Sequence, residues 1–243
     1  MHENLISTPV RKVLLFLFFT LSLFLNSQTI SGEELLNKAI EYHDPNSNWS
    51  HFKDSFTVTM ESPDKPKRIS TITIDLPNSF FKMEVQLGEN HWSSTLDQEN
   101  CELRFNETDR ITPEIEKEYR LNCDSAWRYR DYYTYLYGLP MKLKDPGTRI
   151  DPQVVEKTIA NKTYWVLKVT YDPEVGTDTW YFYFDQKTFA LKRYQFFHDE
   201  SKNDGEYIIL QEEIELSEIR IPKNRSWYFN ADNTFLGTDL LTK

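Results

Sequence analysis

Residue types that commonly do chemistry are present in this chain, but their spacing forms no catalytic or metal-binding motif. His43, His51, His91 and His198 are dispersed, and none has a second histidine or a glutamate at the spacing of a metal-binding helix. No Gly-x-Ser-x-Gly motif places a serine nucleophile on a tight turn. The carboxylates are scattered along the sequence, as surface charges are. A carboxylate pair for sugar hydrolysis comes together in space rather than in sequence, so the sequence leaves such a pair as an open alternative. We therefore predict a non-enzymatic protein with no cofactor and no metal.

The only two cysteines, Cys101 and Cys123, favour a disulfide. The leader described in the next paragraph predicts export to an oxidising compartment, where two cysteines form a disulfide that closes a loop. Closing a loop of about 22 residues stabilises a fold by about 3 kcal/mol in the chain-entropy model. The alternative is two independent buried thiols. A metal site is disfavoured because neither cysteine has a second Cys or a His at ligand spacing.

Residues 1–27 have the pattern of a secretory signal peptide. Arg11 and Lys12 precede an apolar run over 13–25, and small residues follow. The alternative is a membrane anchor, but a spanning helix needs about 20 apolar residues. We therefore expect export to the periplasm or cell envelope, or secretion. After leader cleavage we expect one domain over 28–243 with no integral membrane segment.

Charge and composition narrow the choice of partner. The formal net charge is −10, whereas nucleic acid and anionic membrane surfaces both attract a positive face. Aromatic residues make up 15% of the chain and only 7 residues are glycine, which is typical of a packed fold rather than disorder. We therefore expect no nucleic-acid partner.

The strongest structural pattern is a β-hairpin made of Thr179–Asp185 and Ala190–Phe197. A short polar link joins these aromatic segments. One face of the first strand carries Trp180, Phe182 and Phe184, which must lie against something dry. The other face carries tyrosines at 181 and 183, which we expect to tolerate water.

Period-two alternation repeats on both sides of this hairpin at a spacing of about ten residues. It predicts an antiparallel meander of about ten or eleven strands, interrupted by a helical region over 111–146. Strand-like segments lie at 55–60, 69–76, 80–87, 91–97, 102–106, 154–159, 164–171, 179–185, 190–197, 206–216, 218–221, 226–229 and 234–240. Strand–helix–strand alternation and Gly-rich phosphate loops are lacking, which excludes dinucleotide-binding folds.

The first helix is predicted over Glu33–Tyr42. Ser31 and Glu34 form a capping box, and apolar residues follow at helical spacing. The helix should stop near His43, because the Asp-Pro dipeptide that follows disfavours continuation. At that position His43 should make a favourable contact with the helix dipole.

A second helix is predicted over Ser125–Tyr137, with Asp124 as its N-cap and glycine and proline ending it. Its arginines interleave with five tyrosines, which suits a lid at the mouth of a pocket, because tyrosine is apolar along its body and polar at its tip. The alternative is a helix that packs its rings on the sheet and leaves its arginine heads in water.

The helix, meander, helical interruption and closing meander resemble the LolA/LolB-like superfamily of periplasmic lipoprotein carriers. The matching residues are the segment Tyr181–Phe197, with Asp185 and Thr188 in its turn, and Ile221-Pro222 ahead of the closing strands. The stretch Asp131–Thr148 is also similar to uncharacterised exported bacterial members of that superfamily. The resemblance implies a concave apolar sheet, covered by helices, that holds acyl chains or other hydrophobic groups.

These observations together predict an α+β fold in which a strongly curved antiparallel sheet, a half-open barrel, is covered by two helical segments. The predicted function is non-catalytic binding of a lipid or an acylated protein. The alternatives are a structural or protein-interaction module with a filled interior and, third, an enzyme on a barrel-like scaffold. The candidate cavity and lid residues are Trp127, Tyr132, Tyr133, Trp165, Trp180, Phe182, Phe184, Tyr194 and Phe196.

Overall fold

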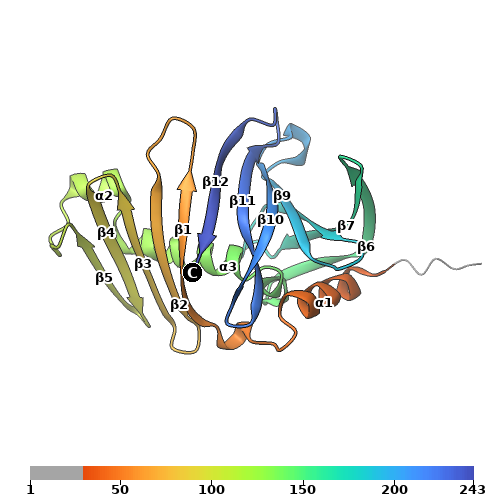
Figure 1. Ribbon diagram of the computed structural model, residues 1–243, viewed down its shortest axis with the longest axis horizontal. Coiled ribbons are helices and arrows are strands. Elements are labelled where there is room, and N and C mark those ends of the chain that lie inside the picture. Colours follow the sequence, from red (N-terminus) through yellow and green to blue (C-terminus); the bar gives the residue numbers. More distant parts are fainter. Residues whose placement is uncertain (1–29) are drawn as a thin grey trace, which may run out of the picture.

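One twelve-stranded antiparallel sheet organises residues 30–243, the part of the chain that the computed structural model describes (Figure 1). The predicted leader lies outside the described residues. The strand order is β5-β4-β3-β2-β1-β12-β11-β10-β9-β8-β7-β6, so β5 and β6 form two edges and the sheet does not close. The predicted curved sheet is confirmed, with one or two strands more than expected. The strands are β1 (Lys53–Glu61), β2 (Arg68–Asp75), β3 (Phe80–Leu87), β4 (Asn90–Asp97), β5 (Asn100–Phe105), β6 (Thr148–Ile159), β7 (Lys162–Tyr171), β8 (Thr179–Asp185), β9 (Leu191–Phe197), β10 (Glu206–Leu216), β11 (Ile219–Phe229) and β12 (Phe235–Thr242).

The two faces of the sheet follow from the period-two pattern of its strands. In β3 the side chains of Phe81 and Met83 are buried, whereas Lys82 and Glu84 lie on the opposite face and are more exposed. We call the buried face, against which α3 (Cys123–Tyr137) packs, the inner face, and the opposite face the outer face. Figure 1 shows that the sheet bends around this helix.

Two meanders meet at the centre of the sheet. The strands β1 to β5 form the first and β6 to β12 the second, and the pairing of β1 with β12 joins them. The chain passes between the meanders through α2 (Pro113–Tyr119), α3 and the 3-10 turn Met141–Lys144. The predicted disulfide is present: Cys101 of β5 is bonded to Cys123 at the start of α3, with 6.0 Å between their Cα atoms. It ties an edge strand to the helix that covers the inner face.

Helix α1 (Gly32–His43) lies against β6, β7 and β11. The predicted capping box is confirmed, because the Ser31 and Glu34 side chains each accept the other residue's backbone N–H. The predicted dipole contact of His43 is wrong, because the ring is fully buried and burial lowers its pKa to about 4. The ring is neutral: Nδ1–H donates to the Arg220 carbonyl at 2.6 Å, and Nε2 accepts the Leu191 N–H at 2.9 Å.

Helix α3 begins two residues earlier than predicted. Its N-cap is Asn122, whose Oδ1 accepts the Ser125 N–H at 2.7 Å, so the assignment of Asp124 as the cap is wrong. Both residues can cap a helix, and the structure uses the earlier one. The helix ends at Gly138, ahead of a proline, as predicted.

Candidate ligand-binding site

Helix α3 packs closely on the inner face of the first meander. Its Tyr137 ring lies 4.8 Å from Phe56 of β1, and its Tyr133 ring lies 6.4 Å from Phe81 of β3. All four side chains are 5% exposed or less. A pocket of about 240 Å³ remains beside Phe81 at the edge of this packed region, and a larger one lies over the second meander.

A pocket of about 440 Å³ lies between α3 and the second meander. This volume is within the range of small-molecule sites. Its walls come from α3, the ends of β6 to β8, and the loop between β7 and β8, and they include Tyr135, Pro146, Tyr171, Val175, Gly176 and Trp180. The Tyr135 and Tyr171 hydroxyls bond to each other across it. Burial raises the pKa of Tyr171 to about 12 and also raises the pKa of Tyr135, so both phenols are neutral at physiological pH.

Aromatic rings continue from this pocket along the inner face. Trp180 lies 4.8 Å from Phe196, 5.9 Å from Phe182 and 6.1 Å from Tyr194, measured between ring centroids. Phe182 and Tyr194 are fully buried, whereas Trp180 and Phe196 are partly exposed. Of these rings only Trp180 lines the pocket, and Phe196, Phe182 and Tyr194 pack around it.

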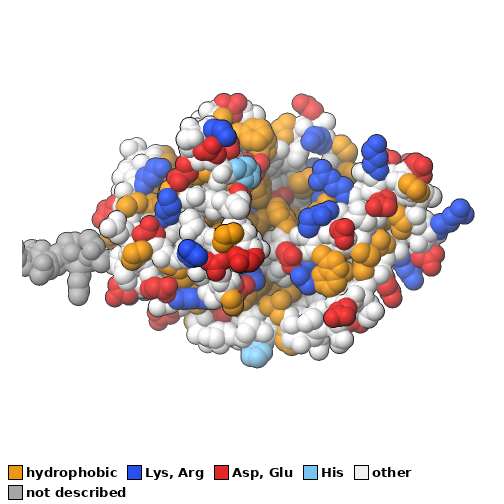
Figure 2. Space-filling view, turned by 180° about the vertical axis from the view of Figure 1, so that it is seen from behind, with side chains coloured by type: hydrophobic (Ala, Val, Ile, Leu, Met, Phe, Trp, Pro, Cys, Tyr) orange, Lys and Arg blue, Asp and Glu red, His pale blue; other side chains and the backbone are white. Residues whose placement is uncertain are grey.

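The molecule is visibly hollowed on the side where α3 lies. Figure 2 shows a recess between two lobes, lined by apolar side chains, with Lys or Arg side chains at its border. The aromatic row extends from Tyr194 to Trp227 of β11 at 6.3 Å. The Trp227 Nε1–H donates to the Asp239 carboxylate at 3.0 Å, and burial raises the pKa of that carboxyl. The inner face is thus aromatic toward β8 and β9 and becomes polar at β11 and β12.

The other predicted site residues lie away from the 440 Å³ pocket. Trp165 and Phe184 face each other across β7 and β8 within the core cluster. Trp127 packs under the guanidinium of Arg130 at 4.5 Å. Tyr132 leaves 42% of its surface exposed, but burial of its hydroxyl end, near Asp239, raises its pKa.

The prediction that Tyr183 tolerates water is wrong, because it is only 1% exposed. The guanidinium of Arg193 covers its ring at 5.2 Å, and its hydroxyl donates to Gln195 at 2.8 Å. Long cationic side chains on neighbouring strands bury an outer-face ring in this way. Sequence reasoning also left Tyr171 out of the pocket, although it continues the alternation of Leu167 and Val169 on the inner face.

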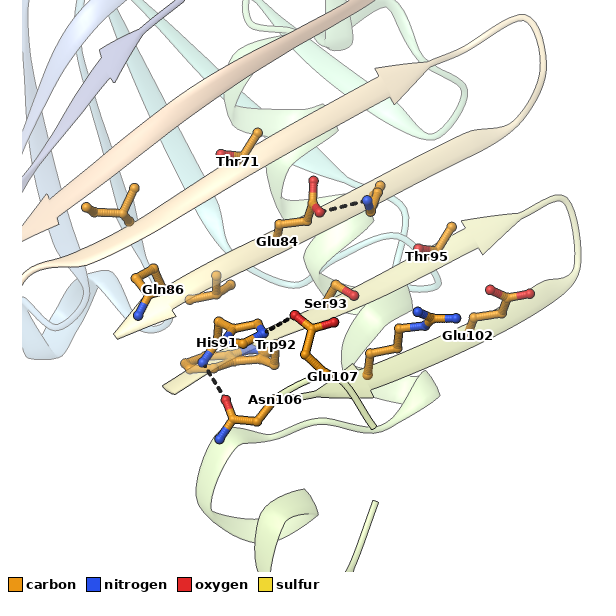
Figure 3. Close-up of a pocket in the computed structure, with 14 residues that line it drawn as sticks. Thr71, Glu84, Gln86, His91, Trp92, Ser93, Thr95, Glu102, Asn106 and Glu107 are labelled. Atoms are coloured by element: carbon orange, nitrogen blue, oxygen red, sulfur yellow. Dashed lines mark hydrogen bonds and ion pairs between the residues drawn. The ribbon is translucent and has the colours of Figure 1, made fainter. Parts of the chain in front are cut away.

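A second depression, of about 490 Å³, lies on the outer face of β2 to β5 (Figure 3). Two pairs of its charged side chains bond to each other: Lys82 lies 2.7 Å from Glu84, and His91 lies 3.0 Å from Glu107. Asn106 accepts the His91 N–H at 2.9 Å and so holds the turn after β5. Polar side chains dominate this surface, whereas most ligand sites have apolar walls. It is therefore the weaker candidate.

Within residues 30–243, no group of three or more His, Cys, Asp and Glu side chains is arranged to hold a metal ion. None of the helices in the same range has the length and apolar character that crossing a bilayer demands.

The open sheet bent around a helix is the fold of the LolA superfamily. The chain is similar to the LolA superfamily protein NE2245 from Nitrosomonas europaea, with a TM-score of 0.51 and 10% identity over 88% of this chain and 92% of that one. It is also similar to a DUF1329 family protein from Desulfovibrio piger, with a TM-score of 0.50 and 7% identity over 87% and 91%. The chain belongs to the DUF6503 family, a family of unknown function whose model matches residues 11–243. No curated protein matches it.

Proposed function

We propose that this protein is a non-catalytic binding protein of the bacterial envelope that holds the apolar part of an amphiphile, a lipid or an acylated protein. The apolar chain lies in the pocket between α3 and the second meander, against Trp180 and Phe196. The protein reaches the envelope through the predicted leader at 1–27.

One observation carries this proposal: the space of about 440 Å³ between α3 and the second meander is larger than the pocket of about 240 Å³ beside the first. Trp180 lines this space with part of its ring uncovered, and Phe196 stacks on Trp180 from the neighbouring strand. Large aromatic side chains bury much apolar area, and a single-chain amphiphile that covers them gains about 0.8 kcal/mol per buried methylene. The LolA-superfamily fold supports the same use of the inner face.

Chain length provides the first test. Octyl, decyl and dodecyl maltoside, each below its micelle concentration, should displace an environment-sensitive dye from the purified protein. Two added methylenes contribute about 1.6 kcal/mol, so each step should tighten binding by about tenfold until the pocket is full. An affinity that does not depend on chain length contradicts burial of the chain.

A substitution that fills the pocket provides the second test. Gly176 lines the pocket, and a Cβ built there would meet only the Tyr171 side chain, at 3.9 Å. Gly176→Phe should therefore add a ring to the pocket without backbone strain and weaken decyl maltoside at least tenfold. Lys187→Phe is the matched control, because it adds the same ring at an exposed turn between β8 and β9. Equal affinities of the two variants would argue against this pocket.

The second candidate function is a structural or interaction module, and the packed first meander favours it. Phe56, Phe81 and Tyr137 are buried against one another there. Under this alternative the remaining pocket holds only water, and none of the maltosides displaces the dye.

A further inference from the structure

A row of charged side chains crosses the inner face at the centre of the sheet. Met60 of β1 pairs with Arg68 of β2 on one side and with Asp239 of β12 on the other, and Asp239 pairs with Arg225 of β11. The four residues therefore lie side by side on one face. They face α3, because the guanidinium of Arg225 lies 3.9 Å from the Tyr137 ring centre and that of Arg68 lies 5.5 Å from the centre of the Tyr129 ring.

This row is only partly satisfied by its own surroundings. Arg225 is 1% exposed and donates to the Pro222 and Leu136 carbonyls, but its Nε has no partner among the described residues. The Nε of Arg68 and the hydroxyl of Tyr194 are likewise buried without a partner. Buried polar groups are normally hydrogen-bonded, so several unpaired groups on one face of the sheet point to a polar ligand.

The charge of the row is positive inside a protein whose net charge is −10. Its two guanidiniums face one carboxyl, and Asp239 makes no ion pair with either arginine, since its oxygens accept only from Trp227. Burial raises the pKa of Asp239, so its negative charge is held there at a cost. Guanidinium groups bind phosphate and carboxylate oxygens through charge-assisted hydrogen bonds.

The row is continuous with the aromatic pocket. Trp180 at the pocket contacts Tyr194, and Tyr194 contacts Trp227, at 6.1 Å and 6.3 Å between ring centroids. Trp227 in turn bonds Asp239. The charged row therefore lies at the end of an unbroken line of inner-face side chains that starts at the pocket wall.

We propose that this row is a head-group subsite, and that the ligand is an amphiphile with an anionic head, a phosphate or a carboxylate, held between Arg68 and Arg225. The proposal rests on the proposed function, because it requires the apolar chain to lie in the pocket. It narrows the ligand from any hydrophobic molecule to an acidic one, and it gives the buried charges of the inner face a partner.

Three amphiphiles with the same chain test the head group: decyl phosphate, decyl maltoside and decyltrimethylammonium, each below its micelle concentration. The full mature protein should bind the phosphate at least tenfold more tightly than the maltoside, and the cation most weakly. Arg68→Gln should weaken the phosphate about tenfold and change the maltoside less than twofold. Arg104→Gln, the same change at an exposed position of β5, is the matched control and should leave all three unchanged.

Asp239→Asn is a second variant that keeps the size of the side chain and its acceptor for Trp227. It removes a negative charge beside the head group, so the phosphate should bind several-fold more tightly. If phosphate and maltoside bind equally and neither variant separates them, the head-group subsite is wrong while the proposed function stands. If none of the three amphiphiles binds, both proposals fall.

Discussion

The buried His43 makes the stability of this fold depend on pH. Its ring is neutral because burial lowers its pKa from 6.5 to about 4, while it bridges the Arg220 carbonyl and the Leu191 N–H. In the unfolded chain the ring takes up a proton near pH 6.5, whereas in the folded protein it does so only near pH 4. Between these values the unfolded state binds more protons, so the free energy of unfolding falls as the pH falls.

The size of this effect follows from the two pKa values. Lowering the pKa from 6.5 to about 4 corresponds to about 3 kcal/mol, lost progressively from about pH 7 to pH 4. His43→Gln removes the titrating ring, so its stability should change less over this range, even though it is lower at pH 7 because a hydrogen bond is lost.

Urea unfolding, repeated at half-unit steps from pH 7 to pH 4, measures how the free energy of unfolding depends on pH. The free energy of unfolding of the wild type minus that of His43→Gln should shrink steadily as the pH is lowered. His51→Gln is the control, because His51 is exposed in the turn before β1, and its curve should run parallel to that of the wild type. Parallel curves for wild type and His43→Gln would refute the neutral, buried state of this ring.

Three further changes test the supports of α1 and α3 by chemical unfolding. Asn122→Ala should lower the free energy of unfolding by about 1 kcal/mol, because α3 loses its N-cap, and Asp124→Ala should lower it by much less. A larger loss for Asp124→Ala than for Asn122→Ala would show that Asp124 is the cap, as the sequence predicted. Replacing both Cys101 and Cys123 by alanine should lower stability by about 3 kcal/mol, and an unchanged midpoint would contradict a stabilising disulfide. Gly32→Ala should lower the free energy of unfolding by about 2 kcal/mol or more, because a Cβ there would lie 2.0 Å from a backbone oxygen of β6. An unchanged free energy of unfolding would show that α1 lies further from the sheet.

Local patterns predicted much of this fold correctly. The segment Thr179–Asp185 is β8 with the same bounds, and the capping box at Ser31 starts α1. Both depend on residues close in sequence: period-two aromatic alternation in one case and an N-terminal hydrogen-bond pair in the other. The rings at Trp180 and Phe196 were assigned to one face for the same reason, and they do lie together.

The charged row could not be predicted in this way. Asp239 lies near the end of the chain and Met60 near the start of the sheet, so only the pairing of β1 with β12 makes them neighbours. No short-range pattern fixes such a non-local register. The same limit explains the error at His43, which is buried against Arg220 and Leu191, far away in sequence. Tyr183 was misjudged for a different reason, because the cationic side chains of Lys157 and Arg193 on neighbouring strands cover its ring. A polar or amphipathic residue near the end of an element, or on the outer face of a sheet, is predicted from sequence to be exposed. The structure is needed to show which neighbouring side chains cover it.

The most direct test of the central claim is native mass spectrometry of the mature protein, purified without detergent from its own cells, beside the Gly176→Phe variant. If an amphiphile occupies the space between α3 and the second meander, the wild-type protein should carry one added mass of a single-chain or double-chain amphiphile, released on collisional activation, and the variant should not. The claim would be contradicted if both proteins showed only the mass of the ligand-free polypeptide and neither bound added decyl phosphate or decyl maltoside.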